Sequence, residues 1–442
     1  MAGQLILALA ILVSLHEWGH YIASRAFGIK VEKFFIFFDA WGIKLFSKKV
    51  NDTEWGIGWL PLGGYVKISG MIDESLDKDQ LESQPEDFEF RSKPAWQRLI
   101  VMIGGVTVNF ILGILIFALS LWFYGEQWLP TSTVNNGDGI FVTEIGKKVG
   151  LEHGDKVLKV NGEEVERFRS LQNPSYLLED SELSYEIERQ GTKQAILVPD
   201  SIKKEILESK GNSLFSYRFA PVIGKMAKKG GAKEADLKVE DKIITIEGKE
   251  VKFFDELGPI LQSYKSKSVA VKVKRGEEVI TTNVTLDTAG KMGFNPTNSA
   301  HYKGQYQVTK YGFFESFPEG TKRGLSTLML NINAFKQMFQ GKLNPVKTMS
   351  GPFQIAGIYG STWDWHKFWQ ITGMLSFILA FMNLLPIPAL DGGHVLFLLI
   401  EMLRGKPLPE KVMYYFQIVG MIILFALMAF VLIVDGLSLF GK

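Results

Sequence analysis

The chain has 442 residues, of which 49 are basic and 47 acidic, and it contains no cysteine. The net charge of +2 leaves no basic excess for a phosphate backbone, which argues against nucleic acid as a partner. Without cysteine there are no disulfides, no thiolate zinc ligands and no cysteine nucleophile, while the redox compartment stays open.

Four apolar runs predict an α-helical polytopic membrane protein with four transmembrane helices, which excludes an ordinary soluble enzyme. Residues 99–123, 368–385 and 413–434 carry no charge, and each run is long enough to cross a bilayer as a helix. The N-terminal run is apolar up to Leu15, lacks the basic region of a signal peptide, and is interpreted as a retained first span. The predicted spans cover residues 1–27, 98–124, 367–388 and 412–438.

The basic residues at the ends of these spans predict the orientation of the chain. Arg25 and Lys30 stand at the end of the first span, and Arg404 lies between the third and the fourth. Because basic residues concentrate in cytoplasmic loops, we expect loops 28–97 and 389–411 in the cytoplasm. The soluble region and both termini are expected on the opposite side.

The segment His16-Glu17-Trp18-Gly19-His20 in the first span predicts a zinc (Zn²⁺) site. Positions i and i+4 share one face of a helix, so His16 and His20 can present two nitrogen atoms to one metal ion. Glu17 lies beside them, where it can accept a proton from the attacking water. A chance pattern is the alternative, but unpaired ionisable groups in a membrane span are costly and usually functional.

The loop 28–97 is rich in Phe, Trp, Ile and Gly between Val31 and Lys67. Strand-like runs interrupted by glycine predict membrane-associated β-hairpins. Their free edge can pair with an extended substrate and expose the scissile amide. The alternative is a hairpin that rests on the membrane without a role in substrate binding.

The soluble region contains an internal repeat, because residues 154–165 align with residues 240–251 at an offset of 86. Each copy reads as a short strand closed by a tight turn at Gly162 or Gly248. The second copy carries Glu247 where such a turn usually has Asn or Asp, which leaves its geometry open. Two inserted α+β domains are predicted, over residues 125–214 and 215–290.

An amphipathic helix is predicted in the region 291–366. Leu325, Leu328, Ile332 and Phe335 recur at helical spacing, with polar residues between them. Its apolar face can rest on the membrane surface or pack on the two inserted domains, and we do not expect it to form a fifth span.

The third span ends in residues 383–394, where Pro386 and Pro388 interrupt the helix. The first and third spans run in the same direction, and both carry ionisable groups toward the cytoplasmic half, so we expect Asp391 at the depth of the histidines as the third zinc ligand. The alternative is a proline-glycine turn with a solvated Asp391. His394 is the weaker ligand candidate, and we expect it to support the site structurally.

Two asparagines in the predicted spans have further roles to fill. Asn383 stands at an apolar helix end, where a primary amide is costly unless it has a partner. We expect it to bind the substrate backbone or the developing oxyanion, with a structural contact as the alternative. Asn109 follows Gly104-Gly105, and we expect it to serve close helix packing, with substrate contact as the alternative.

These motifs resemble the site-2 protease family of intramembrane zinc metalloproteases, and the layout is most similar to its bacterial branch of regulator of sigma-E proteases. The resemblance extends to residues 61–67, 105–110 and 350–352. It implies that His16, His20 and Asp391 bind zinc and that Glu17 is the catalytic base. It also implies that the two inserted domains are tandem PDZ-like domains, which bind extended peptides by strand addition.

The leading hypothesis is a zinc metalloendopeptidase that cleaves single-span membrane proteins in regulated intramembrane proteolysis. The resemblance implies substrates of the anti-sigma-factor or signal-peptide-remnant type and a location in the bacterial inner membrane, with the PDZ-like domains in the periplasm. Expected partners are these substrates, peptide ligands of the PDZ-like domains and the lipid bilayer. The alternative is a PDZ membrane scaffold with a vestigial or structural metal site; Glu17 argues against it, because a structural site needs no general base.

Overall fold

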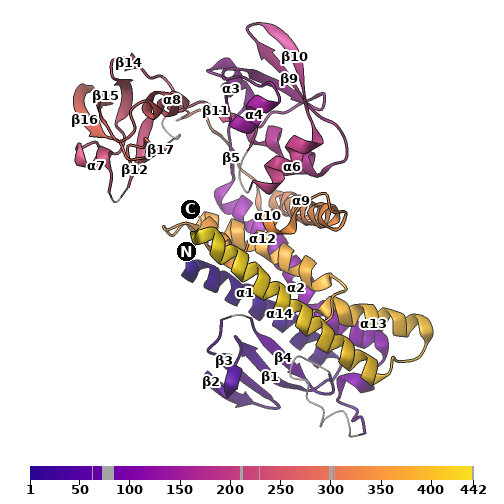
Figure 1. Ribbon diagram of the computed structural model, residues 1–442. Coiled ribbons are helices and arrows are strands. Elements are labelled where there is room, and N and C mark those ends of the chain that lie inside the picture. The colour runs from indigo at the N-terminus through magenta and orange to yellow at the C-terminus, as the bar shows by residue number, and fades with distance from the viewer. Residues whose placement is uncertain are drawn as a thin grey trace. The chain divides into compact units, whose positions relative to one another are not determined.

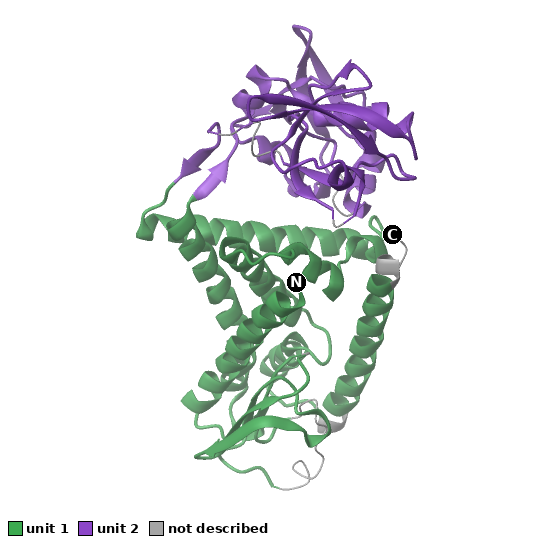
Figure 2. Ribbon diagram, turned by 90° about the vertical axis from the view of Figure 1, so that its left-hand side faces the viewer, with its two compact units in different colours: residues 1–125, 310–442 green, residues 126–309 purple. Residues whose placement is uncertain are grey.

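The computed structural model describes residues 1–61, 63–71, 84–209, 213–227, 229–297, 302 and 304–440. The chain forms two compact units, Met1–Gly125 with Lys310–Lys442 and Glu126–Thr309 (Figure 2). Leu62 of the motif at 61–67 and residues 72–83 of the predicted cytoplasmic loop lie outside the described residues.

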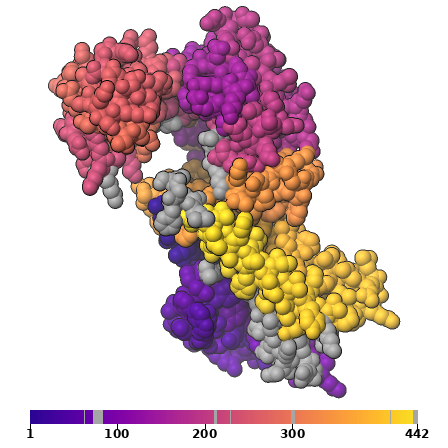
Figure 3. Space-filling view, viewed as in Figure 1, coloured from indigo at the N-terminus to yellow at the C-terminus, as the bar shows by residue number. Residues whose placement is uncertain are grey.

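The first unit is built from long helices (Figure 1). They are α1 (Ala2–Ala26), α2 (Ala95–Tyr124), α9 (Phe313–Phe339), α12 (Trp365–Leu384), α13 (Asp391–Arg404) and α14 (Glu410–Phe440), with the short α10 (Pro345–Thr348) and α11 (Pro352–Tyr359) after α9. Within the described ranges, three stretches are long and apolar enough to cross a membrane: Ala2–Ala26, Ala95–Tyr124 and Val412–Gly436. The yellow helix α14 is exposed along the surface of this unit (Figure 3). Its exposed apolar side chains include Ile422 and Phe425.

Helix α2 lies against α1, α9, α12 and α13, and small residues allow the close approaches. A Cβ atom on Gly320 of α9 would lie 2.7 Å from the backbone nitrogen of Ala118, and one on Gly324 would lie 2.1 Å from the Phe377 ring of α12. The amphipathic helix therefore forms as α9 and packs on α2 and α12, a pair of partners that neither expectation from the sequence included.

The segment after α1 folds into one mixed sheet. Its strands are β1 (Val31–Ile36), β2 (Lys44–Val50), β3 (Thr53–Gly58) and β4 (Tyr65–Ile68), in the order β2-β3-β1-β4. β2 and β3 form a hairpin, whereas β1 runs parallel to β3 and antiparallel to β4. A parallel pair cannot be joined by a tight turn, so local hairpin signals do not reveal it. β4 contacts α1 and stands at one edge of the sheet.

The second unit contains two repeats, each with its own hydrophobic core. The first comprises α3 (Thr131–Asn136), β6 (Ile140–Val142), α4 (Glu144–Lys148), β7 (Lys156–Val160), β8 (Glu163–Glu164), α5 (Pro174–Leu178), β9 (Leu183–Arg189), β10 (Thr192–Val198), α6 (Asp200–Glu208) and β11 (Phe215–Tyr217). The second comprises β12 (Val222–Met226), α7 (Gly231–Glu234), β13 (Lys242–Ile246), β14 (Lys249–Glu250), α8 (Leu257–Gln262), β15 (Ser268–Arg275), β16 (Glu278–Thr285) and β17 (Phe294–Thr297).

A buried ion pair recurs at equivalent positions of the two repeats. Arg189 Nε donates to Asp155 Oδ1 at 2.7 Å, and Arg275 Nε donates to Asp241 Oδ1 at 2.7 Å. Asp155 and Asp241 are almost fully buried. The internal repeat of the sequence is therefore a repeat of structure as well.

The turn that closes each repeated strand is also the same in both copies. Asn161 Oδ1 accepts a hydrogen bond from the backbone of Ser184 at 2.9 Å, and Glu247 Oε1 accepts one from the backbone of Ala270 at 2.6 Å. Asn161 and Glu247 adopt positive φ angles of 49° and 48°. The glutamate thus reproduces the turn by using its longer side chain as the acceptor.

The limits of the repeats differ from the predicted boundaries at residues 214/215 and 290. Phe215 is fully buried in the first core, because β11 pairs with β6. β17 pairs with β12 and extends the second repeat to Thr297. In both repeats the last strand pairs with a strand that lies most of a domain earlier in the sequence. A local sequence motif does not indicate such a pairing. At the ends of the unit, β5 (Glu126–Trp128) pairs with β18 (Gln307–Thr309).

Candidate metal centre

Three ligand atoms from two helices converge in the first unit. His16 Nε2 lies 3.2 Å from His20 Nε2 and 3.1 Å from Asp391 Oδ2, and His20 Nε2 lies 3.4 Å from Asp391 Oδ2. In a tetrahedral zinc site with bonds of about 2.0–2.1 Å, ligand atoms stand roughly 3.3 Å apart. The triangle therefore has the size of one zinc coordination face. Among the described residues, Asp391 Oδ2 is buried and makes no hydrogen bond, which leaves it able to bind a cation.

The rings of both histidines are held through their Nδ1 atoms. His20 Nδ1 lies 2.8 Å from the carbonyl oxygen of Val101, so Nδ1 is the protonated donor and Nε2 keeps its lone pair. His16 Nδ1 lies 3.2 Å from Asn109 Nδ2, while Asn109 Oδ1 is buried and makes no hydrogen bond to a described residue. Since only hydrogen bonds distinguish the two ends of an amide, turning it over lets Oδ1 accept from His16 Nδ1. Both Nε2 atoms then face the centre of the triangle.

Asp391 reaches this position because the chain turns sharply between α12 and α13. Pro386 and Pro388 cannot continue a helix, and Ala389 adopts a positive φ of 71°. A Cβ atom on Gly392 would lie 2.1 Å from the carbonyl oxygen of Leu385, so the turn requires glycine there. α13 begins at Asp391 itself. The predicted cytoplasmic loop 389–411 thus contains a helix, and Asp391 is the first residue of that helix.

Helix α2 passes directly beneath the two histidines. A Cβ atom on Gly105 would lie 2.5 Å from His20 Nε2 and 2.6 Å from His16 Cε1. Only glycine leaves room for both rings. His16 and His20 are buried, as is Asn109 one turn farther along α2. The centre is therefore enclosed by helix backbone on this side.

Glu17 lies near both the metal centre and strand β4. It follows His16 on α1, and its carboxylate interacts electrostatically with His16, His20 and Asp391 and with the backbone of Val66 in the edge strand β4. The carboxylate is thus next to both the three ligand atoms and the free edge of a β-sheet. A peptide placed along that edge would pass close to the Glu17 carboxylate.

Comparison with known proteins decides the family. The profile of peptidase family M50 matches residues 4–427. This chain belongs to peptidase family M50. Among its relatives, the regulator of sigma E protease of Haemophilus influenzae is 29% identical over 454 residues, covering 99% of this chain and 98% of its own. The regulator of sigma E protease of Salmonella typhi is 26% identical over 458 residues, covering 99% and 96%. A Neisseria meningitidis protein named as a zinc metalloprotease is 28% identical over 453 residues, covering 99% and 98%.

Membership of family M50 confirms several predictions from the sequence. The chain is a metalloprotease, its cofactor is zinc, and its apolar helices make it a membrane protein. The group of His16, His20 and Asp391 is the place in the described structure where histidine and carboxylate ligand atoms gather within 4.8 Å of one another. His394, the weaker candidate, is not part of that group.

Asn383 lies next to the metal centre of this M50 protein. Its Nδ2 atom is 3.2 Å from His16 Nε2, and its side chain is partly exposed. From the sequence we expected Asn383 to bind the substrate backbone or the developing oxyanion, with a structural contact as the alternative. The position is compatible with that role and also gives the amide a partner within the protein.

Sequence reasoning missed two supports of the site. Asn109, expected to serve helix packing, contacts His16, and the Val101 carbonyl accepts from His20. The spacing of four between Gly105 and Asn109 places them on one face of α2 and is the signal that indicates a shared role. Val101 contributes its backbone carbonyl, so the identity of its side chain gives no indication of this role.

Proposed function

We propose that this chain is an intramembrane zinc endopeptidase in which His16, His20 and Asp391 bind the catalytic zinc ion and Glu17 acts as the general base. The observation that carries the proposal is the triangle of two Nε2 atoms and one Oδ2 atom, with Glu17 next to it on α1. Three protein ligands leave a fourth position open for water, as in catalytic zinc sites. When bound, zinc supplies Lewis-acid polarisation of the scissile carbonyl and acidifies water.

Each residue around the proposed metal site has its own role in the reaction. Glu17 accepts a proton from the attacking water and returns it to the amine of the leaving peptide. Asn109 and the Val101 carbonyl hold both imidazole rings with Nε2 toward the metal. Asn383 donates a hydrogen bond to the carbonyl oxygen of the scissile peptide as negative charge develops on it.

The substrate we propose is a single-span membrane protein whose scissile segment is extended. A helix uses its carbonyls for its own hydrogen bonds, so a peptide bond must leave the helix before water attacks it. β4 supports this choice, because it is an edge strand and the backbone of its residue Val66 lies close to Glu17. Substrates of the anti-sigma-factor or signal-peptide-remnant type fit the name of the two regulator of sigma E protease relatives.

We further propose four spans, with α12 as the third. Its 20 residues measure about 30 Å, the thickness of a hydrocarbon core. The basic loops assign 28–97 and 389–411 to the cytoplasm of a bacterial inner-membrane protein. The two repeats are then periplasmic PDZ-like domains, and their edge strands β11 and β17 supply backbone groups for strand addition by peptides.

Cleavage of a purified single-span substrate by the detergent-solubilised full chain tests the proposal. Glu17→Gln removes the base and no ligand, so it should retain near-equimolar zinc and lose about 10²-fold or more in turnover. Asp391→Ala should lose zinc as well. Glu144→Gln on the exposed surface of the second unit is the matched control for a carboxyl-to-amide change.

The outcome also separates the proposal from a PDZ scaffold with a structural metal site. A scaffold predicts no cleavage by the wild type, whatever its zinc content. Undiminished turnover of Glu17→Gln would exclude Glu17 as the base, and unchanged zinc in Asp391→Ala would remove Asp391 from the ligand set.

A further inference from the structure

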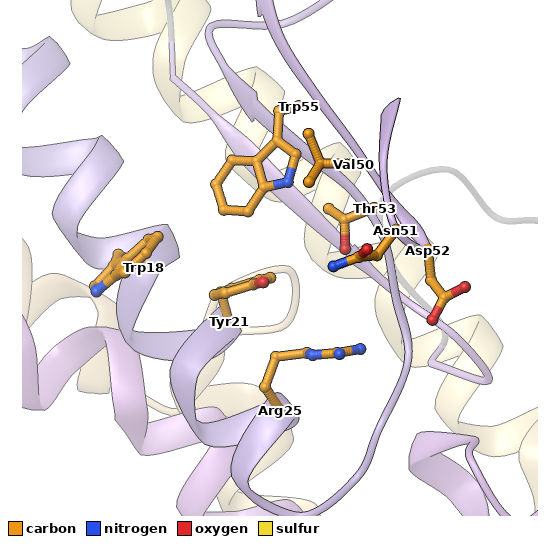
Figure 4. A pocket seen from close by; sticks show the side chains of 8 residues that line it. All are labelled: Trp18, Tyr21, Arg25, Val50, Asn51, Asp52, Thr53 and Trp55. Atoms are coloured by element: carbon orange, nitrogen blue, oxygen red, sulfur yellow. The ribbon is translucent and has the colours of Figure 1, made fainter. Parts of the chain in front are cut away.

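A cavity of about 390 Å³ lies between the C-terminal end of α1 and the turn of the β2–β3 hairpin (Figure 4). Three side chains reach it from α1: Trp18, Tyr21 and Arg25. The hairpin supplies the rest of the wall, with Val50, Asn51, Asp52, Thr53 and Trp55. None of the proposed zinc ligands lines this cavity, so it is a second site in the first unit.

Two opposite charges line this cavity without neutralising each other. The Arg25 side chain extends from α1 toward the hairpin turn that carries Asp52 (Figure 4). Both side chains are exposed, and neither forms an ion pair or a hydrogen bond with another described residue. A guanidinium group is the preferred partner of a phosphate, and a carboxylate accepts hydrogen bonds from an ammonium group. The cavity therefore offers Arg25 to the negative group and Asp52 to the positive group of a zwitterionic ligand.

Three aromatic rings form the apolar part of the wall. The ring of Tyr21 lies edge-on to that of Trp55, with centroids 5.0 Å apart, and Trp18 stacks on Tyr21 at 5.3 Å. The faces of tryptophan and tyrosine attract organic cations. An ammonium group that approaches Asp52 would thus be stabilised by the aromatic rings as well as by the carboxylate.

The cavity lies at the depth of lipid headgroups. α1 has 25 residues and measures about 37 Å, more than the roughly 30 Å of a hydrocarbon core. At least one end of α1 must therefore reach the membrane interface, and the last turns are the better candidate because they carry Tyr21 and Arg25, residue types that concentrate there. The neighbouring strand β2 exposes 68% of Leu45 and 60% of Phe46, as expected of a strand in contact with acyl chains.

We propose that this cavity binds the phosphoethanolamine headgroup of a membrane phospholipid. The Arg25 guanidinium donates to phosphate oxygens, and the primary ammonium donates to Asp52 while lying against the ring of Trp55. Phosphatidylcholine has no N–H group for Asp52. Phosphatidylglycerol carries the same phosphate but an uncharged glycerol, whose hydroxyl groups offer Asp52 only neutral hydrogen-bond donors and give the aromatic rings no cation. This proposal is independent of the function proposed for the metal centre.

Native mass spectrometry of the detergent-solubilised full chain tests the proposal. The protein is titrated with phosphatidylethanolamine, phosphatidylcholine or phosphatidylglycerol of identical acyl chains, and the retained lipid is counted. Wild type should retain phosphatidylethanolamine about tenfold more strongly than the other two, the equivalent of one charge-assisted hydrogen bond. Equal retention of all three lipids would overturn headgroup recognition.

Variants of the two charged residues make the test specific. Arg25→Gln should weaken retention of all three lipids about tenfold, and Asp52→Asn should abolish the preference over phosphatidylglycerol. Asp52→Lys should reverse that preference, a gain that misfolding cannot produce. Lys49→Gln, on β2 and outside the cavity wall, is the control. An unchanged lipid ranking in Asp52→Lys would refute the proposal.

A competition experiment distinguishes the membrane lipid from a soluble compound with the same chemistry. Glycerophosphoethanolamine lacks acyl chains and should displace the lipid only at concentrations at least about 10²-fold higher, since the apolar contacts at β2 are missing. If it binds as tightly as the lipid, the membrane source of the ligand is wrong.

Discussion

Gly19 of α1 and Gly104 of α2 bring two helix backbones into direct contact beside the metal centre. A Cβ atom on Gly19 would lie 2.4 Å from the carbonyl oxygen of Gly104, and one on Gly104 would lie 2.7 Å from that of Gly19. Membrane helices associate through such close packing. The glycine between the two histidines is therefore where α2 crosses α1, and the crossing fixes the depth at which both rings stand.

Gly105→Ala should reduce zinc affinity by about tenfold or more, because the new methyl group would displace both imidazole rings. Zinc content after dialysis against a fixed chelator concentration measures the effect. Gly436→Ala on α14 is the matched control, since no atom lies within 4 Å of its added Cβ. Equal zinc retention in the two variants would show that α2 does not confine the rings.

Asn109→Leu should lower zinc affinity about 10–100-fold, because His16 Nδ1 loses the partner that orients the ring. Asn109→Asp keeps an acceptor for Nδ1–H and should recover part of the loss. Competition with a chelator of known affinity measures both variants. Thr107→Val, exposed on the same helix, should leave affinity unchanged; a similar loss there would point to α2 as a whole rather than to Asn109.

Asp241→Asn should destabilise the second repeat by about 2 kcal/mol at pH 7, because the buried Asp241 carboxylate accepts two hydrogen bonds from the partly exposed Arg275. Burial alone would raise the pKa of Asp241, but hydrogen bonds from Arg275 and the Lys238 backbone outweigh burial and hold the pKa below its ordinary value of 3.8. The folded state thus binds protons less readily than the unfolded state. The stabilisation is complete above pH 3.8 and is lost as the pH falls through the lower, folded value.

Hydrogen exchange of the β13 amides in the full chain, between pH 3 and pH 7, measures this effect. The wild type should lose protection on acidification, and Asp241→Asn should show a flatter profile. Glu277→Gln, almost fully exposed beside Lys274, is the control. A parallel pH dependence in wild type and Asp241→Asn would assign the acid sensitivity to another group.

Asp435→Leu should loosen the start of α11. Asp435 is buried on α14, and its Oδ2 accepts from the backbone N–H of Phe353 at 2.7 Å. Loss of such a cap costs about 1 kcal/mol, so exchange of the first α11 amides should quicken roughly fivefold. Asp435→Asn keeps an acceptor and should exchange almost as the wild type does. Equal exchange in Asp435→Leu would mean that α14 does not hold α11.

The parts of the site that the sequence predicted are those whose chemistry is rare in a membrane. His16, Glu17 and His20 stand out because ionisable groups in an apolar helix are costly, and Asp391 stands out beside two prolines and two glycines. The supports of the site carry weaker signals. Asn109 reads as a packing residue until α2 is placed against α1, and the Val101 contact uses a backbone carbonyl that every residue possesses.

The same distinction holds for the fold. Runs of apolar residues indicate the helices, and the turn at Gly162 and Gly248 reveals the repeat, because both signals are local. The parallel pairing of β1 with β3 and the place of Phe215 in the first core depend on contacts between distant segments. Such contacts are settled by tertiary packing and not by local propensity.

The pairing of β5 with β18 has a consequence for how this protein can change. Glu126 stands opposite Thr309, so the chain leaves for the second unit and returns from it along adjacent strands, only about 5 Å apart. The end of α2 and the start of α9 are therefore connected through neighbouring positions, although the whole second unit lies between them in the sequence. The first unit is thus one compact fold formed by two separate segments of the chain. The inserted repeats can be replaced, enlarged or deleted between β5 and β18 without changing the ends that the first unit must connect.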